Sequence, residues 1–572
     1  MIEDIYEPLI RYRDEFREKF SRLTKEKFQE LLEKSQVDWE ENRRLNQKIA
    51  ATNAELESFK NKNSSLGCIL TILILVIVAG VIAILCGIFG EFDDTEKLKM
   101  VGGGLAASIL PLIILFAVII PHKKKVEQKI TELSSLLKEQ IDKAWQQMEP
   151  LNKLFDWHIT ANLIKETVPR IEFDEYFTES RLLDLYHSFD WDDSYNSDKS
   201  VIMSHSGEIN DNPFVFGELR SMDWKDEVYT GTKVIHWTSR ERDVNGKMRT
   251  VHHTQTLVAT YTAPKPYYYN EKLLLYGNDA APNLHFSREP SELSGKESGF
   301  FNSLKKKSEL KNLKKLSQNL DDDLPYTLMS NHDFELLFHA TDRTDDVAFR
   351  LLFTPLAQQQ MVRLLNDKEC GFGDDFSFRK IGKINAIFAT HLNNTNLNTD
   401  PKQFQFYNVD TAREFFQNFN EDFFRSTYFA LAPLLTIPLY QQTRTHNSIY
   451  NKQTHYKSCF WEHEAIANFY GDSYFKHRNC ITENILKTNC THNADGSSTI
   501  QVTAHGYRGK NQVAHVKVFG NDGRMHSVPV PWVEYLPVSK TSTFHVVEKY
   551  ENKSVSKGKN IIFRRSIQAF FK

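Results

Sequence analysis

Four residues of types that bind zinc stand close together in the last quarter of the sequence. His477, Cys480, Cys490 and His492 form the pattern His-x2-Cys-x9-Cys-x-His. Imidazole and thiolate are the usual ligands of structural zinc, and a turn between the two pairs would bring all four side chains together. The spacing is irregular compared with zinc fingers, and a chain with 20 histidines contains such groups by chance. The four residues are therefore a candidate metal site, with fortuitous spacing as the alternative.

A pair of carboxylates forms a second candidate site. Asp374 and Asp375 follow two glycines in "ECGFGDDFSF". Paired carboxylates can divide the roles of general acid and base, so an enzyme active site would be sought here first. Glycine and aspartate before an apolar stretch are equally what a loop entering a strand needs, and this structural role is the alternative.

Two other strings resemble functional motifs but lack a required residue. In "CFWEHEAIANFYG", His463 and Glu464 begin a zinc-protease pattern, but Ala467 occupies the position of the second histidine, so we expect a helix with surface charge. The acidic stretch from Asp190 to Asp198 starts like a calcium loop, but Tyr195 replaces its glycine, which indicates a solvated turn. No phosphate-binding loop, dinucleotide fingerprint, hydrolase elbow or kinase signature is present. We therefore assign no catalytic residues and no cofactor, and favour a protein that is not an enzyme.

Two uncharged runs indicate that the chain is anchored in a membrane. They cover Leu66–Phe89 and Met100–Pro121, and each exceeds the roughly 20 residues that cross a bilayer as a helix. We predict a transmembrane hairpin over residues 66–121. The first run starts too far from the N-terminus and is too long for a signal peptide. Neither run contains an ionisable residue, so transport is disfavoured and an oligomeric channel is the weakest alternative.

The charges at the ends of the hairpin predict its orientation. Lys123, Lys124 and Lys125 directly follow the second run, whereas the connector Gly90–Lys99 is acidic. Because lysine and arginine accumulate on the cytoplasmic side, both termini of this integral membrane protein should be cytoplasmic. Four cysteines outside the runs show no regular spacing, which suits a reducing compartment: Cys370, Cys459, Cys480 and Cys490.

Long helices are predicted on both sides of the hairpin. Residues 1–65 should form one helix, because no proline or glycine lies between Pro8 and Gly67. Residues 122–165 should form a second helix, kinked or ended by Pro150. Its apolar positions follow a spacing close to a heptad: Val126, Ile130, Leu133, Leu137, Ile141, Ala144, Met148 and Leu151. The two helices could pair as a coiled-coil stalk within one chain, or self-associate between chains.

The remaining chain has the composition of a folded protein. The full sequence is 41% hydrophobic and 12% aromatic, and its net charge of −3 provides no general attraction for nucleic acid. We predict an α+β membrane protein whose cytoplasmic region has two or more subdomains. These are a β-rich domain (166–302) with a hairpin at Asn245-Gly246, a basic linker (303–323), an α+β domain (324–540) and a basic amphipathic tail (541–572). In the tail, Phe563, Ile567, Phe570 and Phe571 would share one helical face, to dock on the membrane or on the protein itself.

Several stretches resemble a known family. They are Ser206–Arg220, Leu273–Pro290, His332–Leu365 and Ser527–Pro537. They are similar to blocks of the uncharacterised two-transmembrane bacterial membrane proteins of the domain-of-unknown-function type three-one-three-seven, as found in Firmicutes or Mollicutes. The resemblance implies a two-span anchor with a cytoplasm-facing domain and no catalytic residues. Our leading hypothesis is a non-catalytic binding or scaffold module whose partners are the lipid bilayer and another protein. An enzyme with a site near Asp374 and Asp375 is the alternative.

Overall fold

The computed structural model describes residues 5–89, 94–242, 247–295, 300–318, 326–444, 456–548 and 561–571. The chain forms two compact units. Unit 1 comprises Met1–Thr24, Asp156–Asp400 and Asn418–Lys572, and unit 2 comprises Lys25–Phe155 and Pro401–Gln417. Helices and antiparallel strands occupy separate stretches, so the predicted α+β class is confirmed.

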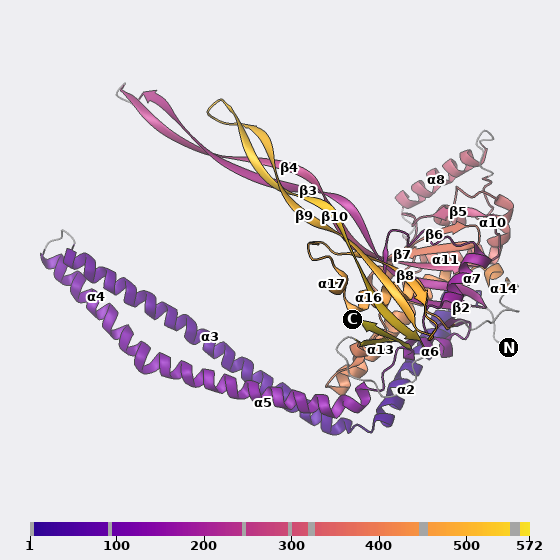
Figure 1. The fold of residues 1–572 in the computed structure, drawn as a ribbon, viewed down its shortest axis with the longest axis horizontal. Coiled ribbons are helices and arrows are strands. Elements are labelled where there is room, and N and C mark those ends of the chain that lie inside the picture. Colours follow the sequence, from indigo (N-terminus) through magenta and orange to yellow (C-terminus); the bar gives the residue numbers. More distant parts are fainter. Residues whose placement is uncertain are drawn as a thin grey trace. The chain divides into compact units, whose positions relative to one another are not determined.

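Unit 2 contains two helices that are long and apolar enough to cross a membrane (Figure 1). The first apolar run lies in α3 (Trp39–Phe89), and the second lies in the continuous helix formed by α4 (Asp94–Ile114), a π-helical turn (Leu115–Ile119) and α5 (Ile120–Asn152). α3 and α4 approach closely at small residues. A Cβ atom on Gly80 would lie 2.9 Å from the Gly104 carbonyl oxygen, so this contact requires glycine.

The predicted stalk positions lie on the packed side of α5. All eight apolar residues from Val126 to Leu151 are buried or half-buried, and α5 packs along α3 within the same chain. The prediction of one helix over residues 1–65 was wrong. Gln36 adopts a left-handed conformation (φ 55°) that ends α2 (Arg17–Ser35), and Asp38 accepts a hydrogen bond from the Glu41 backbone N–H where α3 begins.

Polar contacts hold the segment Pro401–Gln417 on α3 within unit 2. Arg43 donates two hydrogen bonds to the carboxylate of Asp410, at 2.7 and 2.6 Å. The buried Asn42 side chain donates to the Tyr407 carbonyl (3.0 Å) and accepts from the Val409 backbone N–H (3.1 Å). This side chain therefore satisfies backbone groups at the start of α13 (Val409–Leu435) that a helix end leaves unpaired.

Unit 1 is built on two antiparallel sheets. The seven-stranded sheet has the order β1-β2-β3-β4-β7-β6-β5, and the five-stranded sheet has the order β11-β12-β10-β9-β8. The strands of the first sheet are β1 (Ile171–Phe173), β2 (Ser200–Ile209), β3 (Asn212–Arg242), β4 (Met248–Gly277), β5 (His285–Arg288), β6 (Phe376–Ile381) and β7 (Ile384–Ala389). Those of the second are β8 (Ile485–His492), β9 (Ser498–Phe519), β10 (Met525–Glu548), β11 (Ile561–Arg564) and β12 (Ile567–Phe571).

Besides the part of α13 from Asn418 onward, the described residues of unit 1 form further helices. They are α1 (Pro8–Arg11) with the π-helical turn Tyr12–Phe16, α6 (Ile159–Thr167), α7 (Glu179–Phe189), α8 (Phe300–Gln318), α9 (His332–Phe338), α10 (Asp346–Leu352), α11 (Pro355–Asn366), α12 (Thr390–Asn394), α14 (Pro438–Gln442), α16 (Phe460–Tyr470) and α17 (Asp472–Phe475). The apolar stretch Tyr428–Tyr440 is buried, as predicted for core.

The division of the chain at the predicted linker and the secondary structure of the tail both differ from the sequence-based predictions. The seven-stranded sheet takes strands from both sides of the predicted linker 303–323, and residues 303–318 of that linker lie in helix α8, where Leu313 is buried. The tail was predicted to present a helical face, but it forms β11 and β12 instead. It docks on the protein's own body, because β12 pairs with β10 and the Phe571 ring stacks on Tyr470 with centroids 3.7 Å apart.

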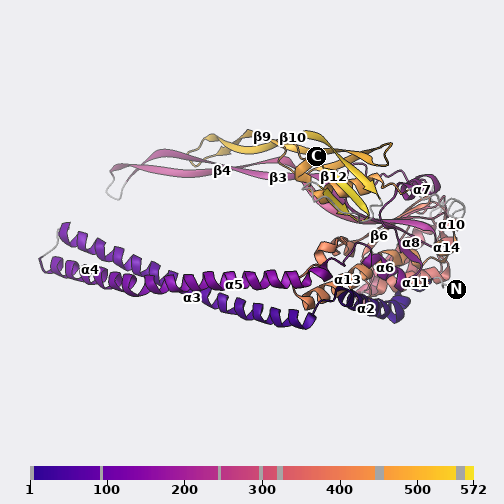
Figure 2. The same cartoon turned by 60° about the horizontal axis from the view of Figure 1, so that its bottom comes forward.

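Two exceptionally long hairpins extend from the sheets as two-stranded ribbons (Figures 1 and 2). β3 pairs with β4 from Phe214 to Arg242, which confirms the predicted hairpin; its turn residues, Asn245 and Gly246, lie outside the described chain. A strand of 31 residues spans about 100 Å. The two ribbons pack face to face through Ile235, Leu257, Ala259, Val528 and Val530. We call this pair of ribbons the double-ribbon arm.

Gly231 allows the ribbons to touch, and its replacement should separate them. A Cβ atom there would contact the Pro529 carbonyl oxygen and lie 2.8 Å from the Val530 Cα atom. We expect Gly231→Ala to lower the free energy of unfolding by about 1–3 kcal/mol through overpacking. Thr230→Ala, on the exposed neighbouring position, is the matched control and should change little. Equal stabilities of the two variants in denaturant titrations would contradict this contact.

Candidate functional site

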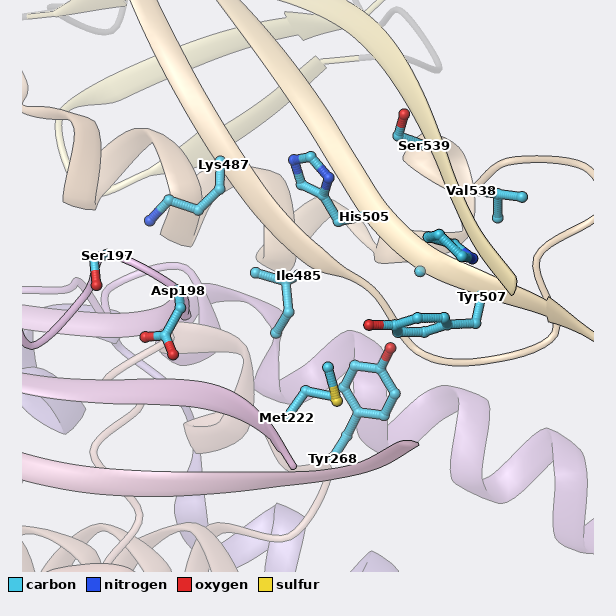
Figure 3. A pocket seen from close by; sticks show the side chains of 12 residues that line it. Ser197, Asp198, Met222, Tyr268, Ile485, Lys487, His505, Tyr507, Val538 and Ser539 are labelled. Atoms are coloured by element: carbon cyan, nitrogen blue, oxygen red, sulfur yellow. The ribbon is translucent and has the colours of Figure 1, made fainter. Parts of the chain in front are cut away.

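A cavity of about 450 Å³ lies in unit 1 at the base of the double-ribbon arm (Figure 3). The loop before β2 provides Ser197 and Asp198, and the other walls come from β3, β4, β8, β9 and β10. The lining residues of these strands are Met222, Tyr268, Ile485, Lys487, His505, Gly506, Tyr507, Pro537, Val538 and Ser539. Both ribbons and both sheets therefore contribute to one site.

One end of the cavity is aromatic and aliphatic. Figure 3 shows the rings of Tyr268 and Tyr507 beside Met222. The Tyr268 hydroxyl lies 3.2 Å from the Thr482 hydroxyl, which accepts a hydrogen bond from the Tyr507 backbone N–H at 3.0 Å. Burial raises the pKa of Tyr268 to about 12, so the phenol stays neutral at physiological pH. This end can contact an apolar or aromatic group.

The other end of the cavity is polar. Lys487 donates to the carbonyl oxygens of Asn196 (2.8 Å) and Lys199 (3.0 Å) and pairs with the Glu464 carboxylate at 2.8 Å. Its charge is therefore used to hold the loop before β2 in place. The exposed side chains of Asp198, His505 and Ser539 form the polar part of the lining.

Helix α16 packs against β2 and β8 and contacts the cavity lining through the Glu464–Lys487 ion pair. Its residues Glu462, His463 and Glu464 are 0%, 1% and 0% exposed. The prediction of a helix with surface charge was therefore wrong. Trp461 is also buried, and a Cβ atom on Gly217 of β3 would lie 2.8 Å from its ring, so glycine makes room for the indole.

The three buried titratable residues of α16 each reach a different part of unit 1. Glu462 pairs with Arg564 and Arg565 at the end of β11, and the Ser204 hydroxyl of β2 donates to it at 3.3 Å. Glu464 accepts a hydrogen bond from the Val201 N–H of β2 (3.0 Å) while pairing with Lys487 of β8. These pairs connect the seven-stranded sheet to the five-stranded sheet.

His463, the third buried titratable residue of α16, forms a hydrogen bond as a neutral imidazole. Its Nε2 lies 2.9 Å from the Ser458 hydroxyl, which donates to the Glu548 carboxylate of β10 at 2.9 Å. Burial, followed by the charges of His492 and Lys457, lowers the pKa of His463 to about 3. The imidazole is therefore neutral at physiological pH and does not place a buried cation next to Lys457.

The acidic loop before β2 is not simply a solvated turn. Trp461 Nε1 donates to the Asp193 carboxylate at 3.2 Å, and Asn196 is fully buried. Burial raises the pKa of Asp193 to about 7; the charge of Glu464 also raises it, while Trp461 and Lys487 oppose the shift. Asp192 is exposed, and the backbone N–H of Ser194 lowers its pKa. The pKa values of these two adjacent carboxylates are therefore shifted in opposite directions from their ordinary value.

The paired carboxylates serve separate structural contacts. Asp374 forms a buried ion pair with Arg288 at 2.6 Å and accepts from the Ser291 backbone N–H. Asp375 contacts His391 Nδ1 at 2.5 Å, and His391 Nε2 lies 2.9 Å from the Ser426 carbonyl oxygen. Both ring nitrogens of His391 thus face acceptors of the protein itself. The two carboxylates point to different partners and do not converge on one point.

The four candidate zinc ligands are divided between different hydrogen-bond networks. The Cys490 sulfur lies 3.7 Å from His492 Nδ1, but Cys480 contacts Thr482 and Asn484, and His477 Nδ1 accepts from the Asn479 backbone N–H. In the described part of the chain, no three such side chains form a group that could hold a metal ion. The cavity itself was not predicted, because its walls come from separate segments whose sequences carry no motif.

Comparisons of the chain with known protein families, with curated protein sequences and with solved structures give no match.

Asp193 should give unit 1 a defined pH dependence. Its pKa is about 7 in the folded protein and 3.8 in its ordinary state, so the unfolded chain loses this proton first and stability falls as pH rises between these values. Asp193→Asn should remove this loss, which is about 1.4 kcal/mol per pH unit across the window. Denaturant titrations of the full chain from pH 4 to pH 8 measure the effect.

Asp192→Asn is the matched control for this prediction. The pKa of Asp192 is lowered, so its contribution to stability is present at neutral pH and is lost on acidification, which is the opposite sign. Identical pH profiles for wild-type protein and Asp193→Asn would contradict the buried environment described for Asp193.

Proposed function

We propose that this protein is a membrane-anchored binding module. The cavity at the base of the double-ribbon arm would receive an apolar or aromatic group of a partner protein. The observation that carries the proposal is the cavity's lining, with tyrosine, methionine and aliphatic side chains at one end and a polar rim at the other.

The size and chemistry of the cavity support binding. Ligand sites generally have volumes of about 300–1,000 Å³, apolar walls and a few polar groups that orient the ligand. The volume of about 450 Å³ falls within this range. Lys487 holds Glu464 and two backbone carbonyls, so the lining supplies contact surface and hydrogen-bonding groups without a free ammonium.

The two long apolar helices support the anchoring part of the proposal. We place residues 66–89 and 100–121 in the bilayer, where their exposed apolar side chains would meet lipid. Lys123, Lys124 and Lys125 would remain on the cytoplasmic side, together with the segments on both sides of the hairpin. The membrane would be that of a bacterial cell. Helices α3 and α5 pair within one chain, and their outer faces would offer a route to self-association.

Occupancy of the cavity can be tested by site-specific photocrosslinking in native membranes. A benzophenone amino acid in place of the exposed lining residue His505 should capture a defined partner. Val513 is the matched control, because it lies on the same strand, is 55% exposed and is not part of the lining. Adding Ser539→Trp should fill the cavity and reduce capture at His505 about tenfold. Equal capture at both positions, or capture unaffected by Ser539→Trp, would contradict the proposal.

The orientation is tested by cysteine accessibility in intact cells. Val347 is 69% exposed in α10, so Val347→Cys should react with a membrane-impermeant maleimide after permeabilisation. We expect no reaction before permeabilisation, because unit 1 would face the cytoplasm. Wild-type protein reports the background from its own cysteines. Labelling of Val347→Cys in intact cells would place unit 1 outside and overturn the orientation.

A further inference from the structure

A groove of about 720 Å³ lies between α3 and α5 in unit 2. One face of α3 supplies most of its lining, through Ala54, Glu57, Ser58, Asn61, Lys62, Ser65, Leu66 and Ile69, and His122 of α5 completes it. These α3 residues recur at helical spacing, so they form one continuous stripe. The groove crosses the point where the first uncharged run begins, and His122 directly follows the end of the second run.

The chemistry of the groove changes along the helix axis. Ser58, Asn61 and Ser65 present hydroxyl and amide groups, and beyond them Leu66 and Ile69 present aliphatic side chains. A membrane phospholipid has the same order, since its polar headgroup lies next to its acyl chains. The polar part of the groove would therefore lie at headgroup depth when residues 66–89 span the bilayer.

The lining of the groove contains one ammonium, Lys62, and one carboxylate, Glu57. The Lys62 ammonium stands over the Phe59 ring, 4.9 Å from its centroid, and has no carboxylate partner among the residues that the structure describes. Glu57 is the acidic residue of the lining, and Lys60 neutralises it at 2.8 Å. Lysines near the membrane surface attract anionic lipid with about 1 kcal/mol each.

We infer that this groove binds the phosphate headgroup of an anionic membrane lipid. Lys62 and His122 would contact the phosphate, Ser58 and Asn61 would donate hydrogen bonds to the headgroup, and an acyl chain would lie along Leu66 and Ile69. The Ser65 hydroxyl already donates to the Asn61 carbonyl oxygen at 3.0 Å and would line the groove as an acceptor. This inference rests on the proposed membrane anchoring. It adds a specific ligand at a site separate from the cavity of unit 1, and it gives the anchor a preference for anionic membranes.

The inference is tested with the full-length protein and fluorescent lipids in mixed micelles. A dansyl-labelled phosphatidylglycerol should bind more tightly than the matching phosphatidylcholine. Lys62→Gln should weaken phosphatidylglycerol binding about fivefold or more, because it removes the ammonium at the headgroup. Lys124→Gln is the matched control: it removes an equal charge near the same boundary but outside the lining, so its effect should stay below about twofold. Ser58→Trp should also abolish the preference by filling the groove without changing charge.

Each other outcome has a defined meaning. Equal losses from Lys62→Gln and Lys124→Gln would indicate diffuse surface charge and overturn the groove as a site. Displacement of the lipid by millimolar inorganic phosphate would show a phosphate site that does not require a lipid, and would overturn the lipid assignment. Release of the protein from membranes by alkaline carbonate would instead refute the anchoring itself. Retention in carbonate without lipid preference would refute this inference alone.

Discussion

The buried ion pairs of helix α16 are the constraint on which the rest of unit 1 depends. Glu462 and Glu464 are fully buried. Glu462 pairs with Arg564 and Arg565 of the five-stranded sheet and accepts a hydrogen bond from Ser204 of the seven-stranded sheet. Glu464 pairs with Lys487 of the five-stranded sheet and accepts from Val201 of the seven-stranded sheet. Removing one member of such a pair leaves an unpaired buried charge, which typically destabilises a protein by about 3–5 kcal/mol. These buried pairs therefore fix the orientation of one sheet relative to the other. Because each sheet continues into one ribbon, this geometry also determines where the ribbons meet and leave a cavity between them.

The cavity of unit 1 follows from this architecture, and the ligand proposed for the groove of unit 2 depends on the proposed membrane anchor. In unit 1 the base of the double-ribbon arm contains a cavity whose lining would contact the proposed partner. In unit 2 the polar stripe of α3 and His122 meets the boundary of the uncharged runs, where lipid headgroups would lie. The cavity of unit 1 offers tyrosine and aliphatic side chains to its proposed ligand, and the groove of unit 2 offers an ammonium and hydroxyl groups. The buried charges near the cavity are already paired with one another and serve the fold.

Features that depend on neighbouring residues were predictable from the sequence. The uncharged runs are visible in local composition, and the apolar seam of α5 is visible in local periodicity. The hairpin of β3 and β4 was predictable from its β-prone arms, but its length was not predicted. The break at Gln36 also had a local signal, because Asp38 and Glu41 form a helix-start pattern that was overlooked. Burial of α16 was not predictable, because Glu462 looks like a surface residue until Arg564, 102 positions later, is placed beside it. The tail was mistaken for a helix because the pairing of β12 with β10, rather than its own periodicity, determines its structure. The cavity has six contributing segments, so spacing within any one of them carries no signal.

The most direct test of the central role of α16 is amide hydrogen exchange on the full chain carrying Glu462→Gln. The predicted result is faster exchange in β2, in β11 and β12, and in the strands that line the cavity, because one substitution weakens the connection between both sheets. Glu483→Gln, which removes an exposed glutamate paired with Arg220, should leave these strands unchanged. Faster exchange confined to α16, or equal effects of the two substitutions, would contradict the account.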